Sequence, residues 1–241
     1  MITGKNKMAD LIHLNYLLIS VINRFGITLG FGDKSVQEVC LEHNVKLDFF
    51  LEIVNSFHDE DYFPEENLQD FSVSLITDYL GKTHRYYLDV KIPELEKLIN
   101  LMVIECYANN KYAVLLESFF REYKNELIAH TKREDEKVFP YSISTELAFL
   151  NKDTSLIESI ASEGYSIQKY SSEHDDIESK LYDLKNIIIK YLAPTGNPSL
   201  CSKVLTELFN LEKDLNDHSR IEEKVLIPKV LHMEKSLKHR K

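Results

Sequence analysis

The chain has 241 residues, a formal net charge of −10, a hydrophobic fraction of 44% and a charged fraction of 28%. This is enough apolar material for a packed core, whereas seven glycines and six prolines are too few for a β-rich or loop-rich fold. The negative charge argues against nucleic acid and against an anionic membrane surface as partners, because both require a basic patch.

The cysteines indicate a reducing compartment. They are odd in number, far apart and form no C-x-x-C pair, so they suggest neither a disulfide framework nor a zinc ribbon. They are Cys40, Cys106 and Cys201. Nothing approaches a run of about 18 uninterrupted apolar residues, and no small-residue cleavage site follows the apolar N-terminal stretch. We therefore expect a cytoplasmic protein without a membrane span.

Residues 1–60 are expected to form a small helical domain. Apolar residues at helical spacing predict one helix over 10–25, and three glycines then mark a turn. Ser35 is placed to cap a second helix, and residues 46–57 have the pattern of a third. The stretch 61–70 is acidic and polar, so we interpret it as a linker.

Four long amphipathic stretches fill residues 71–241. They cover about 72–104, 111–138, 155–192 and 199–235. Pro93 either kinks the first stretch or starts a new helix, and Pro140 is expected to end the second. Long helices joined by mostly short loops predict an all-α fold with an up-down-up-down four-helix bundle.

An internal repeat is the strongest signal in the chain. The sequence HTKREDEKVFP at 130–140 matches HSRIEEKVLIP at 218–228, with His at the first place, Glu four places later and Pro at the end. A second histidine pair, His84 and His174, is separated by nearly the same number of residues. Duplication of a helical hairpin explains both matches, with one helix carrying a His and the next carrying H-x-x-x-E.

The repeated residues fall on the apolar stripes of the four stretches, at places where a core leucine is expected. They are His84, His130, His174 and His218, together with Glu134 and Glu222. A single histidine on an apolar face is more often an ordinary core residue, and H-x-x-x-E is often a surface pair. Two carboxylates on the core stripe do not fit that interpretation, because a buried unpaired carboxylate costs several kcal/mol. Bound cations would neutralise them.

Six imidazole and carboxylate ligands suit iron or manganese better than structural zinc, which usually takes four ligands and often thiolates. They are too many for one open site and suit two metal ions, with each carboxylate bridging. The chain contains no E-x-x-H, which ferritin-like di-iron proteins use. Glu126 and Glu173 lie next to the motifs, where either could orient an imidazole. A solvated helix-face acid is an equal alternative for both.

With these motifs the chain resembles the repair-of-iron-centres (RIC) family of di-iron proteins. His84, HTKRE (130–134), EHDD (173–176) and HSRIE (218–222) resemble the hemerythrin-like domain of that family, and DLIHLNYLLISVINRFGI resembles its short N-terminal domain. The resemblance implies that the four histidines are terminal ligands of two non-haem irons, that Glu134 and Glu222 bridge them, and that Glu126 and Glu173 lie nearby. It also implies a cytoplasmic stress-response protein that is often dimeric.

The chain departs from the family at one place. Family members have two adjacent cysteines followed by glycines in the N-terminal domain, whereas this chain has TLGFGD, with Gly30 and Phe31 at the cysteine positions. This departure puts any thiol chemistry of the domain in doubt and leaves the di-iron site unchanged.

The function expected from these observations is repair of iron–sulfur clusters damaged by nitric oxide or oxidants. The centre would bind NO or O2, or donate iron to a damaged iron–sulfur protein. A sensor of NO or O2 without catalysis is the main alternative, and simple iron or oxygen storage is a third. The sequence does not decide among them.

Overall fold

The computed structural model describes residues 1–107, 111–152, 165–172, 177–193 and 196–238, and the regular elements within these ranges are helices joined by turns and loops. Over these residues no strand is formed beyond one isolated bridge between Lys7 and Ser35. The prediction of an all-α fold is confirmed.

The N-terminal unit contains the helices α1 (Met8–Leu14), α2 (Leu18–Arg24), α3 (Val36–Glu42) and α4 (Leu47–His58). The predicted capping is confirmed, since Ser35 and Glu38 form a reciprocal capping box at the start of α3. The prediction of one continuous helix over 10–25 was wrong. Asn15 is extended (φ −155°, ψ 103°), and its side chain accepts the N–H of Leu17 at 3.1 Å, which ends α1 and starts a new helix.

The stretch 61–70, expected to be a linker, contains the short helix α5 (Glu65–Gln69). Leu68 of this helix is fully buried, and the ammonium of Lys229 donates to the carbonyl of Gln69 at 2.7 Å. The segment is therefore packed on the C-terminal part of the bundle.

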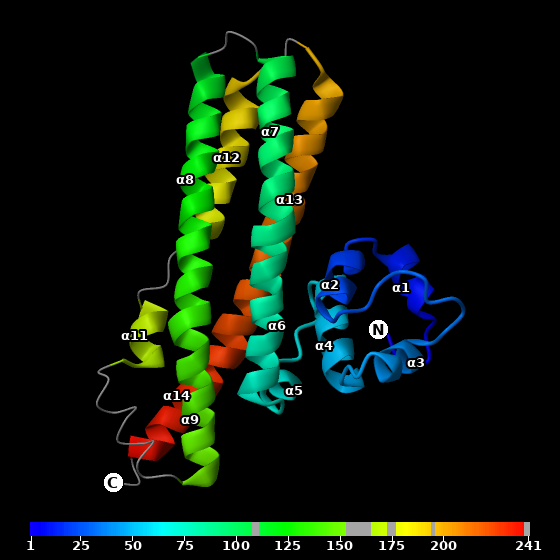
Figure 1. Cartoon of the computed structure of the whole chain (residues 1–241), viewed down its shortest axis with the longest axis vertical. Coiled ribbons are helices and arrows are strands. Elements are labelled where there is room, and N and C mark those ends of the chain that lie inside the picture. Colours follow the sequence, from blue (N-terminus) through cyan, green and yellow to red (C-terminus); the bar gives the residue numbers. More distant parts are fainter. Residues whose placement is uncertain (108–110, 153–164, 173–176, 194–195, 239–241) are drawn as a thin grey trace.

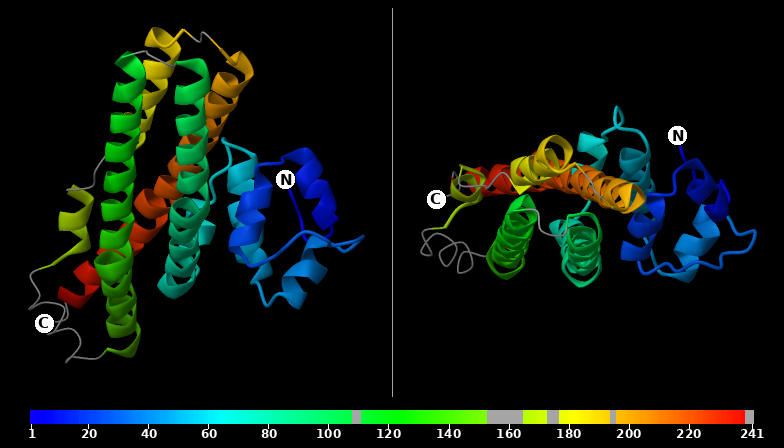
Figure 2. Two further views of the ribbon diagram at one scale, coloured as in Figure 1. Left: turned by 45° about the horizontal axis from the view of Figure 1, so that its top comes forward. Right: turned by 90° about the horizontal axis from the view of Figure 1, so that it is seen from above.

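Long helices form the rest of the molecule. In chain order they are α6 (Val73–Tyr86), α7 (Ile92–Cys106), α8 (Lys111–Arg133), α9 (Phe139–Asn151), α11 (Ile167–Ser172), α12 (Ile177–Tyr191), α13 (Pro198–Ile221) and α14 (Ile227–Lys238). In the upper half, α7 packs against α8 and α13, and α12 packs against the same two helices (Figure 1). Seen from above, α7 and α8 form one layer and α12 and α13 the other (Figure 2). The predicted hemerythrin-like bundle is confirmed.

Three π-helical segments join these helices into longer ones. They are η1 (Tyr87–Lys91), η2 (Glu134–Val138) and η3 (Glu222–Leu226), and each ends two residues before a proline. Proline does not fit an uninterrupted α-helix, because it lacks the amide donor and its ring meets the carbonyl four residues earlier. The wider π turn accommodates it. The prediction that the second stretch ends at Pro140 was therefore wrong, since α9 continues to Asn151.

The buried apolar residues form two clusters, one above the other. The upper cluster takes residues from α7, α8, α12 and α13, and the lower cluster joins α6, α9, α11 and α14 to the N-terminal unit. Along each helix the change from one cluster to the other falls at the repeated motifs. Leu127 belongs to the upper cluster and Val138 to the lower, with His130 and Glu134 between them.

A buried ion pair fixes the N-terminal unit to the bundle. The Arg24 guanidinium of α2 is 4% exposed and binds the Asp214 carboxylate of α13 through both nitrogens of its fork. Tyr87 donates a hydrogen bond to the same carboxylate at 3.1 Å, and the guanidinium lies 4.6 Å from the ring centre of Tyr86. None of the described helices has the length and apolar character that a membrane crossing requires.

Candidate metal centre

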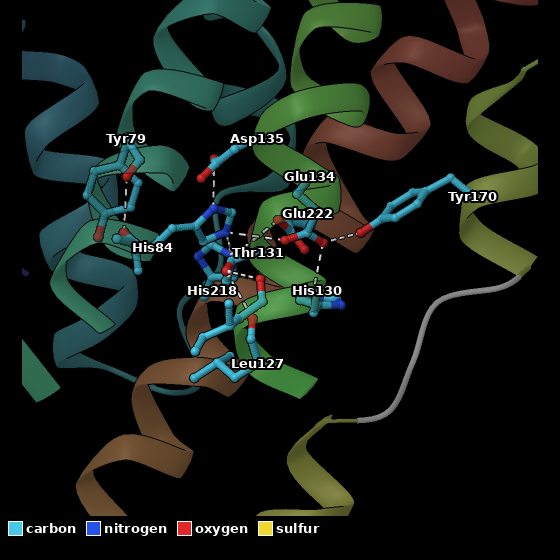
Figure 3. Close-up of polar contacts among 12 residues, drawn as sticks. Tyr79, His84, Leu127, His130, Thr131, Glu134, Asp135, Tyr170, His218 and Glu222 are labelled. Atoms are coloured by element: carbon cyan, nitrogen blue, oxygen red, sulfur yellow. Dashed lines mark hydrogen bonds and ion pairs between the residues drawn. The ribbon is translucent and has the colours of Figure 1, made fainter. Parts of the chain in front are cut away.

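Four polar side chains meet between the two apolar clusters. His84 comes from the last turn of α6, His218 from the last turn of α13, and Glu134 and Glu222 are the first residues of η2 and η3. All four are buried, and one potential ligand atom of each lies within 4.8 Å of the others. Figure 3 shows them converging from three long helical stretches. Four of the six predicted ligands, from both halves of the repeat, thus lie together in the bundle interior.

The two histidines of this cluster face each other through their Nε2 atoms, which are 3.1 Å apart. The Nε2 atom of His84 is also 3.3 Å from Oε2 of Glu134, and that of His218 is 3.1 Å from Oε1 of Glu222. Two imidazole nitrogens and two carboxylates pointing at one small volume are the usual surroundings of a bound cation.

The two carboxylate oxygens of Glu134 contact two different histidines. Oε2 approaches His84, while Oε1 lies 3.0 Å from Nε2 of His130, one turn earlier on the same helix. The His130 side chain is 10% exposed and lies outside the tight group of four. A carboxylate in this position has the geometry to bridge two neighbouring ions.

Asp135 orients His84 from the opposite side of the ring. Its Oδ1 is 2.9 Å from Nδ1 of His84, so Nε2 is directed into the cluster (Figure 3). Burial by itself favours the neutral imidazole, but the hydrogen bonds to Asp135 and Glu134 and the charge of Glu222 outweigh it and raise the pKa of His84 to about 9. A protonated His84 offsets one of the two buried carboxylate charges.

Tyr170 of α11 donates its hydroxyl to Oε1 of Glu134 in a short hydrogen bond (Figure 3). Its side chain is 4% exposed, and burial, with the charges of Glu222 and Glu134, raises the pKa of the phenol far above its usual range. The sequence pattern gave Tyr170 no role at the site. The signal that could have found it is its position one turn before His174 on the same stripe.

The remaining predicted site residues are placed as follows. His174 and Glu173 lie outside the described residues. Glu126 is on α8, but its side chain is 44% exposed and forms an ion pair with Lys180 of α12. It is not among the four groups that meet in the interior.

The donor set fits a metal. The side chains of Glu134 and Glu222 are 0% and 2% exposed, and two carboxylates removed from water to this degree need positive charge close by. Imidazole and carboxylate donors without thiolate are typical of iron and manganese sites.

Comparison with known families supports this chemistry. Residues 93–230 match the family described as the hemerythrin HHE cation binding domain, which is more than half of the chain. The chain belongs to this family. The matched residues include both H-x-x-x-E motifs, whereas His84 precedes them.

Full-length relatives are also found. The chain is 20% identical over 230 residues to the iron-sulfur cluster repair protein ScdA of Staphylococcus haemolyticus (strain JCSC1435), covering 95% of this chain and 99% of the relative. The protein of the same name from Staphylococcus epidermidis (strain ATCC 12228) is 20% identical over 232 residues, covering 95% and 100%. Together with the hemerythrin match, they confirm the family resemblance identified in the sequence.

The N-terminal unit has no thiol at the positions of the expected cysteine pair. Phe31 is buried in the lower cluster, and Gly30 has φ +107°, a conformation that side chains rarely adopt. Cys40, the nearest cysteine in the chain, is 1% exposed, and burial raises the pKa of its thiol to about 11. A buried thiol with a raised pKa is chemically inert.

Proposed function

We propose that this protein holds two iron ions at the interior cluster and takes part in repairing iron–sulfur clusters damaged by nitrosative or oxidative stress. Glu134 and Glu222 would bridge the ions, and the terminal ligands would be the four repeated histidines, namely His84, His130, His174 and His218. When bound, the iron pair would supply open positions for NO or O2, or iron for transfer to a damaged protein.

The observation that carries the proposal is the position of Glu134. Its two oxygens approach histidines on different helices, His84 on α6 and His130 on α8, at 3.3 and 3.0 Å. A carboxylate that served one ion would need only one of these contacts. The similarity to proteins named for iron–sulfur cluster repair supplies the biological side of the proposal.

The protein's own groups prepare the site in three ways. Asp135 holds the His84 ring so that its second nitrogen faces the cluster. The two apolar clusters exclude water from above and below, which strengthens the attraction between carboxylates and cations. The protonated His84 ring would release one proton on metal binding, because only the neutral imidazole is a ligand.

The test uses protein loaded with ferrous iron under anaerobic conditions. We expect stoichiometric NO binding and reactivation of an enzyme whose iron–sulfur cluster has been damaged by NO. The variant Glu222→Ala should lose both activities, whereas Glu126→Ala, which removes an ion-paired surface carboxylate, should keep them. Reactivation no better than that obtained with the same amount of free ferrous iron would refute the repair function.

A sensor without catalysis is the second candidate. It is favoured by the Arg24–Asp214 ion pair, which ties the N-terminal unit to the helix that carries His218. Tyr87 extends this connection, since it binds Asp214 and its ring lies 5.8 Å from that of His218, edge to face. If the protein is a sensor, the rate of amide hydrogen exchange in α2 should change when NO is added, and no substrate should be consumed. A repair protein would instead restore several damaged protein molecules per chain.

A further inference from the structure

Tyr170 reaches the candidate metal centre from a separate structural element. It lies on α11, a helix of six residues, and its hydroxyl donates to Oε1 of Glu134, the oxygen that faces His130. The Arg133 guanidinium lies 5.6 Å from the ring centre of Tyr170. The phenol is therefore buried against the oxygen of the proposed bridge that faces His130.

A second buried carboxylate anchors α11. Glu234 of α14 is 5% exposed, and its Oε1 accepts both the first backbone N–H of α11, from Ile167 at 2.8 Å, and the hydroxyl of Tyr141 at 2.6 Å. The Tyr141 ring also packs edge to face on Tyr165, with centroids 4.8 Å apart. This network fixes the start of α11 one turn before Tyr170.

We propose that Tyr170 is a positioning residue that holds Glu134 in its bridging orientation, and that Glu234 acts through α11 to place it there. The inference rests on the proposed function, because it concerns the same centre. The O–H donor occupies a lone pair of Oε1 and limits rotation of the carboxylate. Without that donor the carboxylate can rotate as a rigid group. The Oε1 atom, which loses its hydrogen bond, then moves away from His130, whereas the contact of Oε2 is supported on the other side by the His84 ring that Asp135 holds.

The effect on metal binding is therefore unequal. An ion beside His130 would depend on Oε1 as a ligand. Removing the hydroxyl should therefore lower the affinity for that ion by about 10- to 100-fold, the usual cost of losing a partner that orients a ligand. The ion beside His84 would keep His84, His218 and Glu222 as ligands, so its binding should be weakened less. A role limited to packing would weaken both ions together or neither.

The experiment titrates metal-free protein with Co(II) and follows the visible absorption of the bound metal. For Tyr170→Phe, which keeps the ring and so the packing, we expect two equivalents at saturation, with one bound clearly more weakly than the other when compared with the natural protein. The matched control is Tyr182→Phe on α12, which removes an exposed phenol and should change nothing. Far-ultraviolet circular dichroism and the thermal midpoint check that each variant is folded.

Variants at Glu234 test the anchor without touching the centre. Glu234→Ala should weaken the same equivalent as Tyr170→Phe, and Glu234→Gln should restore it, because the amide oxygen still accepts from Ile167 and Tyr141. Combining Glu234→Ala with Tyr170→Phe should add nothing, because both remove one interaction.

Three results separate the possible failures. If the natural protein binds no Co(II) at this site, the proposed function itself fails. If it binds two equivalents and Tyr170→Phe titrates identically, only the positioning role is refuted. If the iron-loaded protein shows phenolate-to-iron charge transfer that Tyr170→Phe abolishes, Tyr170 is a ligand, and the hydrogen-bonding role is overturned.

Discussion

Metal binding at this centre should depend steeply on pH, because His84 must lose a proton first. The pKa of His84 is raised to about 9 by its bonds to Asp135 and Glu134. Two pH units below that value, only about one imidazole in a hundred is neutral. At pH 9 about half of the rings are neutral, so lowering the pH from 9 to 7 should weaken binding about 50-fold on account of His84 alone, since the neutral ring is the ligand.

The stability of the metal-free protein should change in the opposite direction. The folded-state pKa of His84 lies above the value of about 6.5 expected in the unfolded chain. Its contribution to stability is therefore fully present below about pH 6.5 and is lost as the pH rises through about 9. Rising pH should thus loosen the metal-free fold while it strengthens metal binding.

The assay is anaerobic titration with Co(II) across this pH range, with proton release measured in buffers of different ionisation enthalpy. Asp135→Asn is the informative variant, because it removes the first of the interactions that raise the pKa of His84. The Co(II) affinity of this variant should depend less steeply on pH, and its rise should occur at lower pH than in the natural protein. An affinity that stays flat between pH 7 and 9 in the natural protein would refute the protonated His84.

Other predictions concern the supports of the site. Arg24→Met should lower the free energy of unfolding in urea by about 3 kcal/mol, the low end for a buried pair, because it leaves the Asp214 carboxylate, whose side chain is 12% exposed, without its cation. The double variant Arg24→Met with Asp214→Leu should recover most of this loss. A loss below about 1 kcal/mol in the single variant would show that the ion pair behaves as a solvated surface pair. At pH 9, about half of the His84 rings are neutral, so protonation costs the natural protein only about a factor of two in affinity. Asp135→Asn should nevertheless weaken metal binding there by about 10- to 100-fold through poorer orientation of the ring, measured by Co(II) titration. Equal affinities there would refute the orienting role.

The sequence predicted the parts of the site that follow from helical periodicity. His84, His218, Glu134 and Glu222 occupy places where a core leucine would stand, and spacing alone puts them on inward faces. The placement of Tyr170 against Glu134 could not be read in the same way, because it depends on how α11 packs beside α8. Asp135 could not be identified either. It follows Glu134 directly, so regular α-helical spacing places it on a different face of the helix, whereas in the structure it lies within the π segment η2.

Helix boundaries were the least predictable part of the fold. Proline normally signals the end of a helix, yet Pro93, Pro140 and Pro228 each follow a π segment that lets the helix continue. The break at Asn15 was missed because the apolar spacing runs through it, while a hydrogen bond from the Leu17 N–H to the Asn15 side chain decides the local conformation. Backbone hydrogen bonding of this kind leaves no trace in the apolar pattern.

The central claim is that two neighbouring irons share the carboxylate of Glu134 between His84 and His130. It is tested most directly by loading the purified protein with iron, measuring the iron content per chain and recording Mössbauer spectra of the oxidised form. The account predicts two irons per chain whose spins are exchange-coupled, as a shared bridge requires. One iron per chain, or two that are magnetically independent, would contradict it.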